Sequence, residues 1–285
     1  MTSDTYARSN RRDGLSRDQP FEPCEENPYT PGDSDGTCIV FDIGAEYAHF
    51  RKPHSTSSAE TFGIPPRTTV AGLVSGMLGL PRDSYYGLFD PDCSQIAVSL
   101  EAPIHRQSLG MNLLDTKGSK SKTKGAKQSK YVTEHRDPTA ISVISDPRYR
   151  LYVSVDSTPF MNDLDAVVRG ADSSEDGVKP VYTPSLGKAR HLAWIDYIGR
   201  FLMEEEFATG STEIRSAVPG DPIPLVVDTD VRYVSERMPA YMEATDDGGR
   251  VAAGSHRMTY GRAGESLTLK RTDFVTVGGD SVVFS

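Results

Sequence analysis

The chain has 285 residues, of which 40 are acidic and 31 are basic, so its net charge is −9 and its pI is about 5.2. No stretch reaches the eighteen or so apolar residues of a membrane helix, and the first residues lack the apolar run of a signal peptide. The cysteines Cys24, Cys38 and Cys93 form no C-x-x-C pair, which argues against a zinc site or a disulfide framework. We therefore expect a cytoplasmic protein with no membrane contact, no metal and no cofactor.

Residues 1–36 carry eight acids and four bases without a hydrophobic period, which predicts a disordered acidic leader. The apolar run at 38–43 is typical of a buried strand. Two prolines precede a helix predicted at 67–78, because proline is tolerated at the first turn of a helix. Alternating apolar residues then predict a strand at 94–102.

Residues 105–136 form a polar, lysine-rich excursion, and strands are predicted after it at 140–144 and 149–155. A short helix is predicted at 162–170. The stretch 191–195 fits a short helix or a strand, and its pattern does not decide between them. From residue 214 onward the chain is rich in Val, Thr, Tyr and Pro with turn residues, which indicates a β-rich tail.

This order of elements predicts an α+β fold. The best fit is a ferredoxin-like βαββαβ domain over residues 37–210, with the basic excursion at 105–136 as a long insertion. Residues 211–285 are predicted to be a β-rich C-terminal extension.

The type of base is unusual, because the chain has 21 arginines but only 10 lysines. Few lysines and acids spread along the whole chain are expected of a halophilic protein, whose carboxylates keep its surface hydrated in concentrated salt. An ordinary acidic mesophilic protein is the alternative.

Six of the ten lysines lie within fourteen residues of the excursion, whose net charge is +6. Such a concentration in an acidic protein favours an anionic partner, and nucleic acid is the obvious candidate. A solvated loop that binds nothing is the alternative. The lysines are Lys117, Lys120, Lys122, Lys124, Lys127 and Lys130.

Salt limits what these lysines achieve alone. At molar salt the Debye length is about 3 Å, so phosphate contacts lose most of their advantage. Arginine forks and base stacking are weakened less, and we expect them to contribute to binding. The candidates that flank the lysines are His105, Arg106, Tyr131, His135 and Arg136.

The start of the helix after Pro66 is a second candidate anion site. Its first amides have no partner within the helix, Arg67 stands beside them, and Thr68 or Thr69 is expected to cap. The alternative is a helix that only packs. No phosphate-binding GxxxxGK[ST] loop occurs.

Three groups of residues resemble parts of a known family, and the first group consists of several short ranges. Residues 50–51, 64–73 and 78–80 resemble the amino-terminal signature of the CRISPR-associated Cas-five family. Residues 146–153 are similar to its second recognisable strand, and residues 182–188 to its glycine-centred turn. The resemblance extends from about Thr37 to Trp194.

The resemblance implies a RAMP-type, ferredoxin-like RNA-binding domain in a type I Cascade, of the I-B branch common in haloarchaea. It implies one non-catalytic copy that holds the five-prime handle of the crRNA beside the backbone subunit and the large subunit. A hairpin called the thumb would fold over the RNA, and the lysine excursion occupies the corresponding place. The matching positions add four candidate RNA contacts, Arg51, Lys52, Arg148 and Lys188.

Two other functions remain open. One is a metal-independent endoribonuclease that processes repeat RNA, because a relative in type I-C cuts this RNA and cleavage needs a base such as histidine. The other is a halophilic protein unrelated to CRISPR. No spacing singles out a catalytic residue among the candidates His49, His54, His105 and His135.

Overall fold

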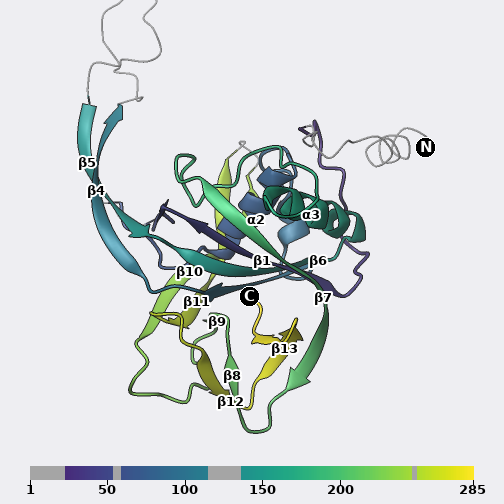
Figure 1. The fold of residues 1–285 in the computed structure, drawn as a ribbon, viewed down its shortest axis with the longest axis vertical. Helices are drawn as coiled ribbons and strands as arrows, with labels where there is room; N and C mark the ends of the chain where they lie inside the picture. Colours follow the sequence, from purple (N-terminus) through teal and green to yellow (C-terminus); the bar gives the residue numbers. More distant parts are fainter. Residues whose placement is uncertain (1–22, 54–58, 115–135, 246–248) are drawn as a thin grey trace, which may run out of the picture.

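The computed structural model describes residues 23–53, 59–114, 136–245 and 249–285. These residues form a mixed α/β fold, mostly strand, with two α-helices (Figure 1). The elements are β1 (Thr37–Ala45), β2 (Tyr47–Ala48), α2 (Arg67–Met77), the 3₁₀ helix η1 (Tyr86–Phe89), β3 (Ser94–Leu100), β4 (His105–Leu114), β5 (Arg136–Ser145), β6 (Arg148–Val155), α3 (Thr158–Ala171), β7 (Ala193–Phe207), β8 (Ser211–Ile214), β9 (Val218–Pro219), β10 (Tyr233–Ala244), β11 (Arg250–Gly261), β12 (Leu267–Lys270), β13 (Asp273–Val277) and β14 (Asp280–Val282).

The central sheet has the strand order β14-β13-β7-β1-β6-β3. Strand β1 pairs antiparallel with both β6 and β7, so it lies in the middle of the sheet. Because side chains alternate along a strand, Ile39, Phe41 and Ile43 share one face, where they join the core with residues of α2 and α3. Amphipathic α3 contributes the fully buried Phe160 and Leu164.

The opposite face of the sheet is covered by the end of the chain. Val40, Ala97 and Tyr152 pack there against Val277 and Val282. Strand β7 pairs with β13 as well as with β1, so the C-terminal residues continue the same sheet.

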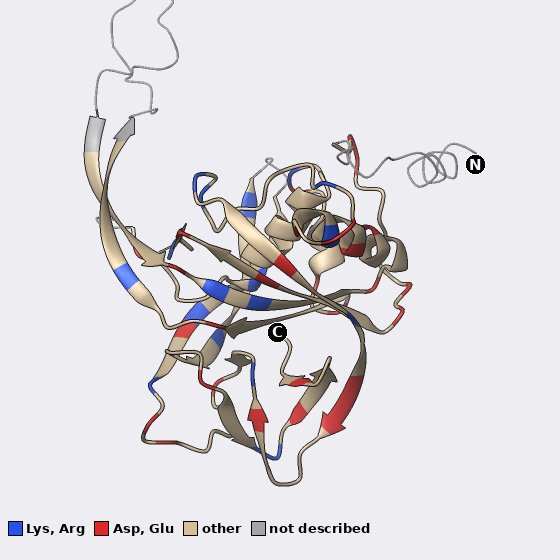
Figure 2. Cartoon of the chain, viewed as in Figure 1, with Lys and Arg blue, Asp and Glu red and all other residues tan. Residues whose placement is uncertain are grey.

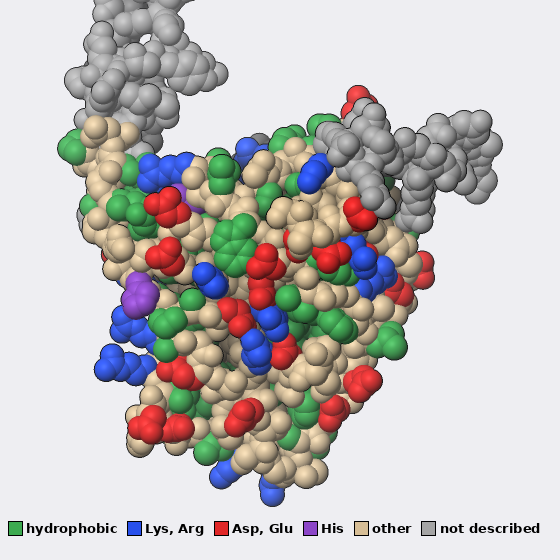
Figure 3. Space-filling view, in the orientation of Figure 1, with side chains coloured by type: hydrophobic (Ala, Val, Ile, Leu, Met, Phe, Trp, Pro, Cys, Tyr) green, Lys and Arg blue, Asp and Glu red, His purple; other side chains and the backbone are tan. Residues whose placement is uncertain are grey.

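Arginine–carboxylate pairs connect this face to the C-terminal strands, and acidic and basic side chains alternate there in Figure 3. Arg150 donates to both carboxylate oxygens of Asp42, at 2.7 and 3.0 Å, and to Asp280 at 3.2 Å. Arg215 bridges Glu101 and the same Asp280. Two-pronged arginine pairs of this kind hold their geometry better than lysine pairs do.

Most of the expected elements are confirmed, but their bounds differ. Strand β4 occupies the start of the supposed excursion, because its residues pair with β5 from His105↔Ser145 to Leu114↔Arg136. The predicted helix at 162–170 begins earlier, at Thr158. Within the ambiguous stretch 191–195, the long strand β7 begins at Ala193, because pairing with β1 decides the conformation from there on.

The expectation of disorder up to residue 36 is wrong for its last part. Tyr29 is buried, and its hydroxyl donates to Asp163 on α3 at 2.8 Å. The amide of Cys24 donates to the carbonyl of Gly79. A few isolated contacts fix this segment, and such contacts produce no periodic pattern in a sequence.

The structure also corrects the expected anion site at α2. Arg67 is only 5 % exposed, and its guanidinium donates to the carbonyls of Phe89 and Ser94, both at 3.1 Å, and to that of Ser285. Pro66 is the N-cap and no side chain caps the helix, so the predicted threonine cap is wrong. Arg67 therefore satisfies buried carbonyls and presents no free fork to a phosphate.

A buried carboxylate joins three parts of the chain. Glu236 on β10 is 8 % exposed and accepts from the Gly63 amide at 2.8 Å and the Tyr260 hydroxyl at 2.6 Å. It also pairs with Lys52 at 2.6 Å and Arg106 at 3.3 Å. Burial opposes its charge, but the hydrogen bonds from Lys52, Tyr260 and Gly63 outweigh burial and hold its pKa below the ordinary value.

We predict that Glu236→Gln lowers the free energy of unfolding by about 1–2 kcal/mol, because it removes the counter-charge of Lys52 and Arg106, which are partly exposed. Urea unfolding at neutral pH measures the change. Glu243→Gln, an exposed acid on the same strand, serves as the control. Equal stability of the two variants would contradict the role assigned to Glu236.

Candidate nucleic-acid interface

The loop between α3 and β7 is fixed by hydrogen bonds to His49, after β2, and to Met77, at the end of α2. The amide of Val181 donates to the carbonyl of Met77 at the end of α2, at 2.9 Å. The amide of His49 donates to Leu186, at 3.1 Å. Gly187 has a φ of +87°, and a Cβ there would lie 2.0 Å from the carbonyl oxygen of His49. Only glycine allows this close approach, which explains the glycine-centred turn seen in the sequence.

This packing brings three cations together. Arg51 and Arg190 are exposed and Lys188 is partly buried. Burial lowers the pKa of Lys188, and the nearby charges of Arg190 and Arg51 lower it further by repelling its positive charge. Among the described residues none of the three has a carboxylate partner in an ion pair. An anion placed here would relieve that repulsion.

Two buried histidines lie next to these cations. His49 is 4 % exposed and His191 is 5 % exposed. The Nδ1 of His49 donates to the carbonyl of Ser142 at 2.7 Å, while its Nε2 and the Nδ1 of His191 have no hydrogen-bond partner within the described part of the chain. Burial lowers the pKa of both rings, and nearby cations, Arg190 among them, lower it further. Both histidines are therefore neutral at pH 7.

A cation and an aromatic ring lie near the end of the central strand β1, where Gly44 pairs with Arg148 on β6 and with Trp194 on β7. The guanidinium of Arg148 lies 5.7 Å from the ring centre of Trp194, which is 41 % exposed. Trp194 lies against Gly44, where a Cβ would be 2.1 Å from the ring. An exposed ring next to a cation suits stacking with an unpaired base. Arg148 was predicted from the sequence, whereas Trp194 and Arg190 were not, because neither belongs to a local motif.

Other predicted contacts lie elsewhere. Lys52 and Arg106 bind Glu236, and Thr68 is partly buried in the first turn of α2 beside the internal Arg67. The backbone of Arg136 starts β5, and its side chain is not described. The remaining predicted residues lie outside the described ranges: Lys117, Lys120, Lys122, Lys124, Lys127, Lys130, Tyr131 and His135.

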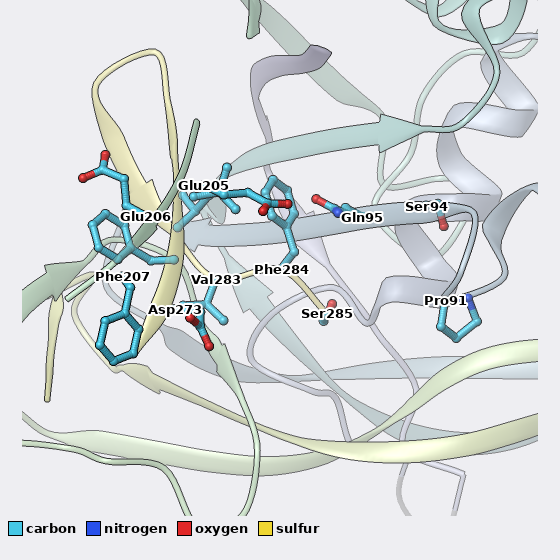
Figure 4. A pocket seen from close by; sticks show the side chains of 13 residues that line it. Pro91, Ser94, Gln95, Glu205, Glu206, Phe207, Asp273, Val283, Phe284 and Ser285 are labelled. Carbon is cyan, nitrogen blue, oxygen red and sulfur yellow. The ribbon is translucent and has the colours of Figure 1, made fainter. Parts of the chain in front are cut away.

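A pocket of about 660 Å³ lies at the far end of β7 (Figure 4). Glu205, Glu206 and Asp273 line it together with Phe207 and Phe284, and no lysine or arginine does. The acids on this end of β7 are red in Figure 2. An anionic lining repels phosphate, so the pocket is unsuited to RNA.

The described ranges contain no group of three or more His, Cys, Asp or Glu that could hold a metal ion. Nor does any helix within them have the length and apolar character needed to cross a bilayer.

Comparison with known proteins places the fold. No family model matches the sequence, and no curated protein matches it. The structure is similar to the crystal structure of a CRISPR protein from Archaeoglobus fulgidus, with a TM-score of 0.52 and 11 % identity over 87 % of this chain and 99 % of that one. The chain thus shares the fold of a CRISPR protein at low sequence identity.

Two weaker similarities are to chains of larger assemblies. One belongs to a CRISPR RNA-guided surveillance complex, with a TM-score of 0.44 and 13 % identity over 81 % of this chain and 91 % of that one. The other belongs to the type III-B Cmr-beta complex bound to cognate target RNA and AMPPnP, with a TM-score of 0.42 and 13 % identity over 80 % and 86 %.

The histidines generate a pH prediction. Since their pKa values are lower in the folded state than the unfolded value of about 6.5, the unfolded state binds more protons below that pH. The free energy of unfolding should therefore fall as the pH drops below about 6.5. His49→Asn keeps a donor for Ser142 but cannot titrate, so its urea midpoint should fall less between pH 7.5 and 5.5. The exposed His105→Asn is the control; an unchanged pH slope for His49→Asn would refute the assignment.

Proposed function

We propose that this chain is a non-catalytic RNA-binding subunit of a type I-B CRISPR Cascade, present in one copy, which caps the five-prime handle of the crRNA. The cluster of Arg51, Lys188 and Arg190 carries the proposal, because these neighbouring cations have no carboxylate partner among the described residues and lie on a fold shared with a CRISPR protein. The backbone subunit and the large subunit are its proposed protein partners.

The topology supports a RAMP-type, ferredoxin-like core. The strands β7-β1-β6-β3 are neighbours in that order, with α2 after β1 and α3 after β6. Without the β4–β5 hairpin, the chain order β1, α2, β3, β6, α3, β7 corresponds to a βαββαβ unit. The β4–β5 hairpin is inserted between β3 and β6 and projects from the body (Figure 1), so we propose that it is the thumb that carries the lysine segment.

One face of the central sheet is covered, and this restricts the surface that is available to RNA. Tyr152 and Val40 are buried under the C-terminal strands, so bases cannot stack on that part of the sheet. The cations Arg51 and Arg190 are exposed and Lys188 is partly buried, outside this covered region. Trp194 pairs beside Gly44 on the same face as Val40 and Tyr152, but it remains 41 % exposed. In this proposal the arginine forks hold phosphates while the indole ring stacks on a base, and both interactions persist in concentrated salt.

Burial of the histidines supports a role without catalysis. A general base must come within about 2.6–3.2 Å of the proton that it removes, either directly or through one water. His49 and His191 are nearly inaccessible, and their lowered pKa values reflect that burial first. We propose that they support the Lys188 loop and leave repeat-RNA cleavage to a separate nuclease.

Neutralising the cluster tests the RNA-binding role. The triple variant Arg51→Gln, Lys188→Gln, Arg190→Gln should bind guide RNA isolated with the complex at least tenfold more weakly, and its salt slope should fall by about one for each lost phosphate contact. Filter binding at several KCl concentrations measures both. Lys270→Gln, an exposed lysine at the end of β12, is the matched control. Wild-type affinity of the triple variant would refute the proposal.

Catalysis has a separate test. The purified chain, incubated with repeat RNA in EDTA, should leave the RNA intact on a denaturing gel. Site-specific cutting that a single histidine substitution abolishes would establish the endoribonuclease function instead.

A further inference from the structure

A small pocket lies between α2 and the loop that carries Lys188. It measures about 260 Å³ and contains no charged side chain in its lining. We call it the α2 slot. Its lining residues are Thr69, Gly72, Leu73, Gly76, Met77, Tyr182, Thr183, Pro184, Ser185 and Gly187.

Of the two α2 glycines that line the slot, Gly72 and Gly76, the second is not explained by crowding. A Cβ at Gly76 would meet no atom within 4 Å, so an alanine would fit. Glycine inside a helix lowers stability relative to alanine, because the unfolded chain loses more conformational freedom. Gly76 therefore keeps a space open at a cost in helix stability.

The loop side supplies an aromatic wall and hydroxyl groups. Tyr182 lines the slot and is 57 % exposed. Thr183 and Ser185 line it too, and their hydroxyls can donate and accept hydrogen bonds. The bond from the Val181 amide to Met77 fixes this loop to α2, so the slot is formed before any ligand arrives.

Size and charge together indicate the ligand class. Sites for drug-sized molecules measure about 300–1,000 Å³, and the slot is smaller. An uncharged lining with an aromatic wall suits one flat heterocyclic ring. Lys188 follows the lining residue Gly187 directly, and Arg51 and Arg190 lie near it. A ring bound in the slot could therefore place the phosphate of its own nucleotide next to a cation.

We propose that the α2 slot binds a single unpaired base of the bound RNA, stacked against Tyr182, while the phosphate of that nucleotide lies on Lys188. This inference rests on the proposed RNA-binding function and adds a position at which the chain takes one base out of the strand. Stacking is tolerant of base identity, and the hydroxyls of Thr183 and Ser185 give the slot its selectivity.

Filling the slot tests this inference. Gly76→Leu places a side chain in the open space, and Leu is a better helix former than glycine, so the melting temperature should not fall. The affinity for guide RNA should drop about tenfold, within the range measured for loss of one stacked base. Gly87→Leu is the matched control, because a Cβ at Gly87 also meets nothing within 4 Å and Gly87 does not line the slot.

Abasic scanning provides the second arm. In the wild-type chain one abasic position in the RNA should weaken binding by about tenfold, and in Gly76→Leu the same position should have no further effect. Tyr182→Ala removes an exposed ring without touching the helix and should reproduce the loss, even if Gly76→Leu fails to fold.

The outcomes separate the two proposals. If the Arg51, Lys188, Arg190 triple variant loses RNA but Gly76→Leu and Tyr182→Ala bind normally, the slot proposal alone is refuted. The same holds if no abasic position stands out. If the slot variants keep RNA but lose a protein subunit of the complex, the slot holds a protein side chain and the base proposal is wrong.

Discussion

The buried carboxylate of Glu236 on β10 connects segments of the chain that lie far apart in the sequence. Its partners come from β4, from β11 and from the segment between β2 and α2. A lone charge at a site only 8 % exposed would be costly, so the donors must be present together. Because Arg106 on β4 and Gly63 before α2 both bind Glu236, the base of the β4–β5 hairpin is held in place relative to α2. The need for these donors also determines that Lys52 and Arg106 are structural, whereas the adjacent Arg51 forms no ion pair with an acid in the described part of the chain.

Charge pairing divides the arginines into two groups. Arg150, Arg200 and Arg215 are held by carboxylates in pairs that connect strands or fix the segment before β1. Arg51 and Arg190 have no acid in an ion pair among the described residues, although the chain carries nine more acids than bases. Other cations, Lys270 among them, also lack an ion pair within the described ranges, but Arg51 and Arg190 lie close enough to Lys188 to lower its pKa, so their shared surface favours an external anion. The pocket at the far end of β7 is lined by acids, so its charge is opposite to that of the cluster of Arg51, Lys188 and Arg190.

Helix α2 combines two roles that its sequence does not separate. Arg67 begins the helix inside the protein, satisfying carbonyls before β3 and at Ser285. Gly76 at the other end leaves space beside the loop of Tyr182. Arg67 belongs to a segment that resembles a family signature, and Gly76 lies between two such segments; the structure places Arg67 in the core and Gly76 beside an open space.

The sequence by itself determined the order of strands and helices, because hydrophobic periodicity and turn residues act over a few neighbouring positions. Thus β1, α2, β3, β6 and α3 were predictable, as was the β-rich tail. Only the tertiary structure decided that 193–195 begins a strand and that Arg67 and His49 are buried. It also decided that Arg190 lies near Arg51 and Lys188, and that Trp194 lies beside Arg148. These outcomes depend on which distant segments pack together, and a local pattern of charges or apolar residues does not specify that packing.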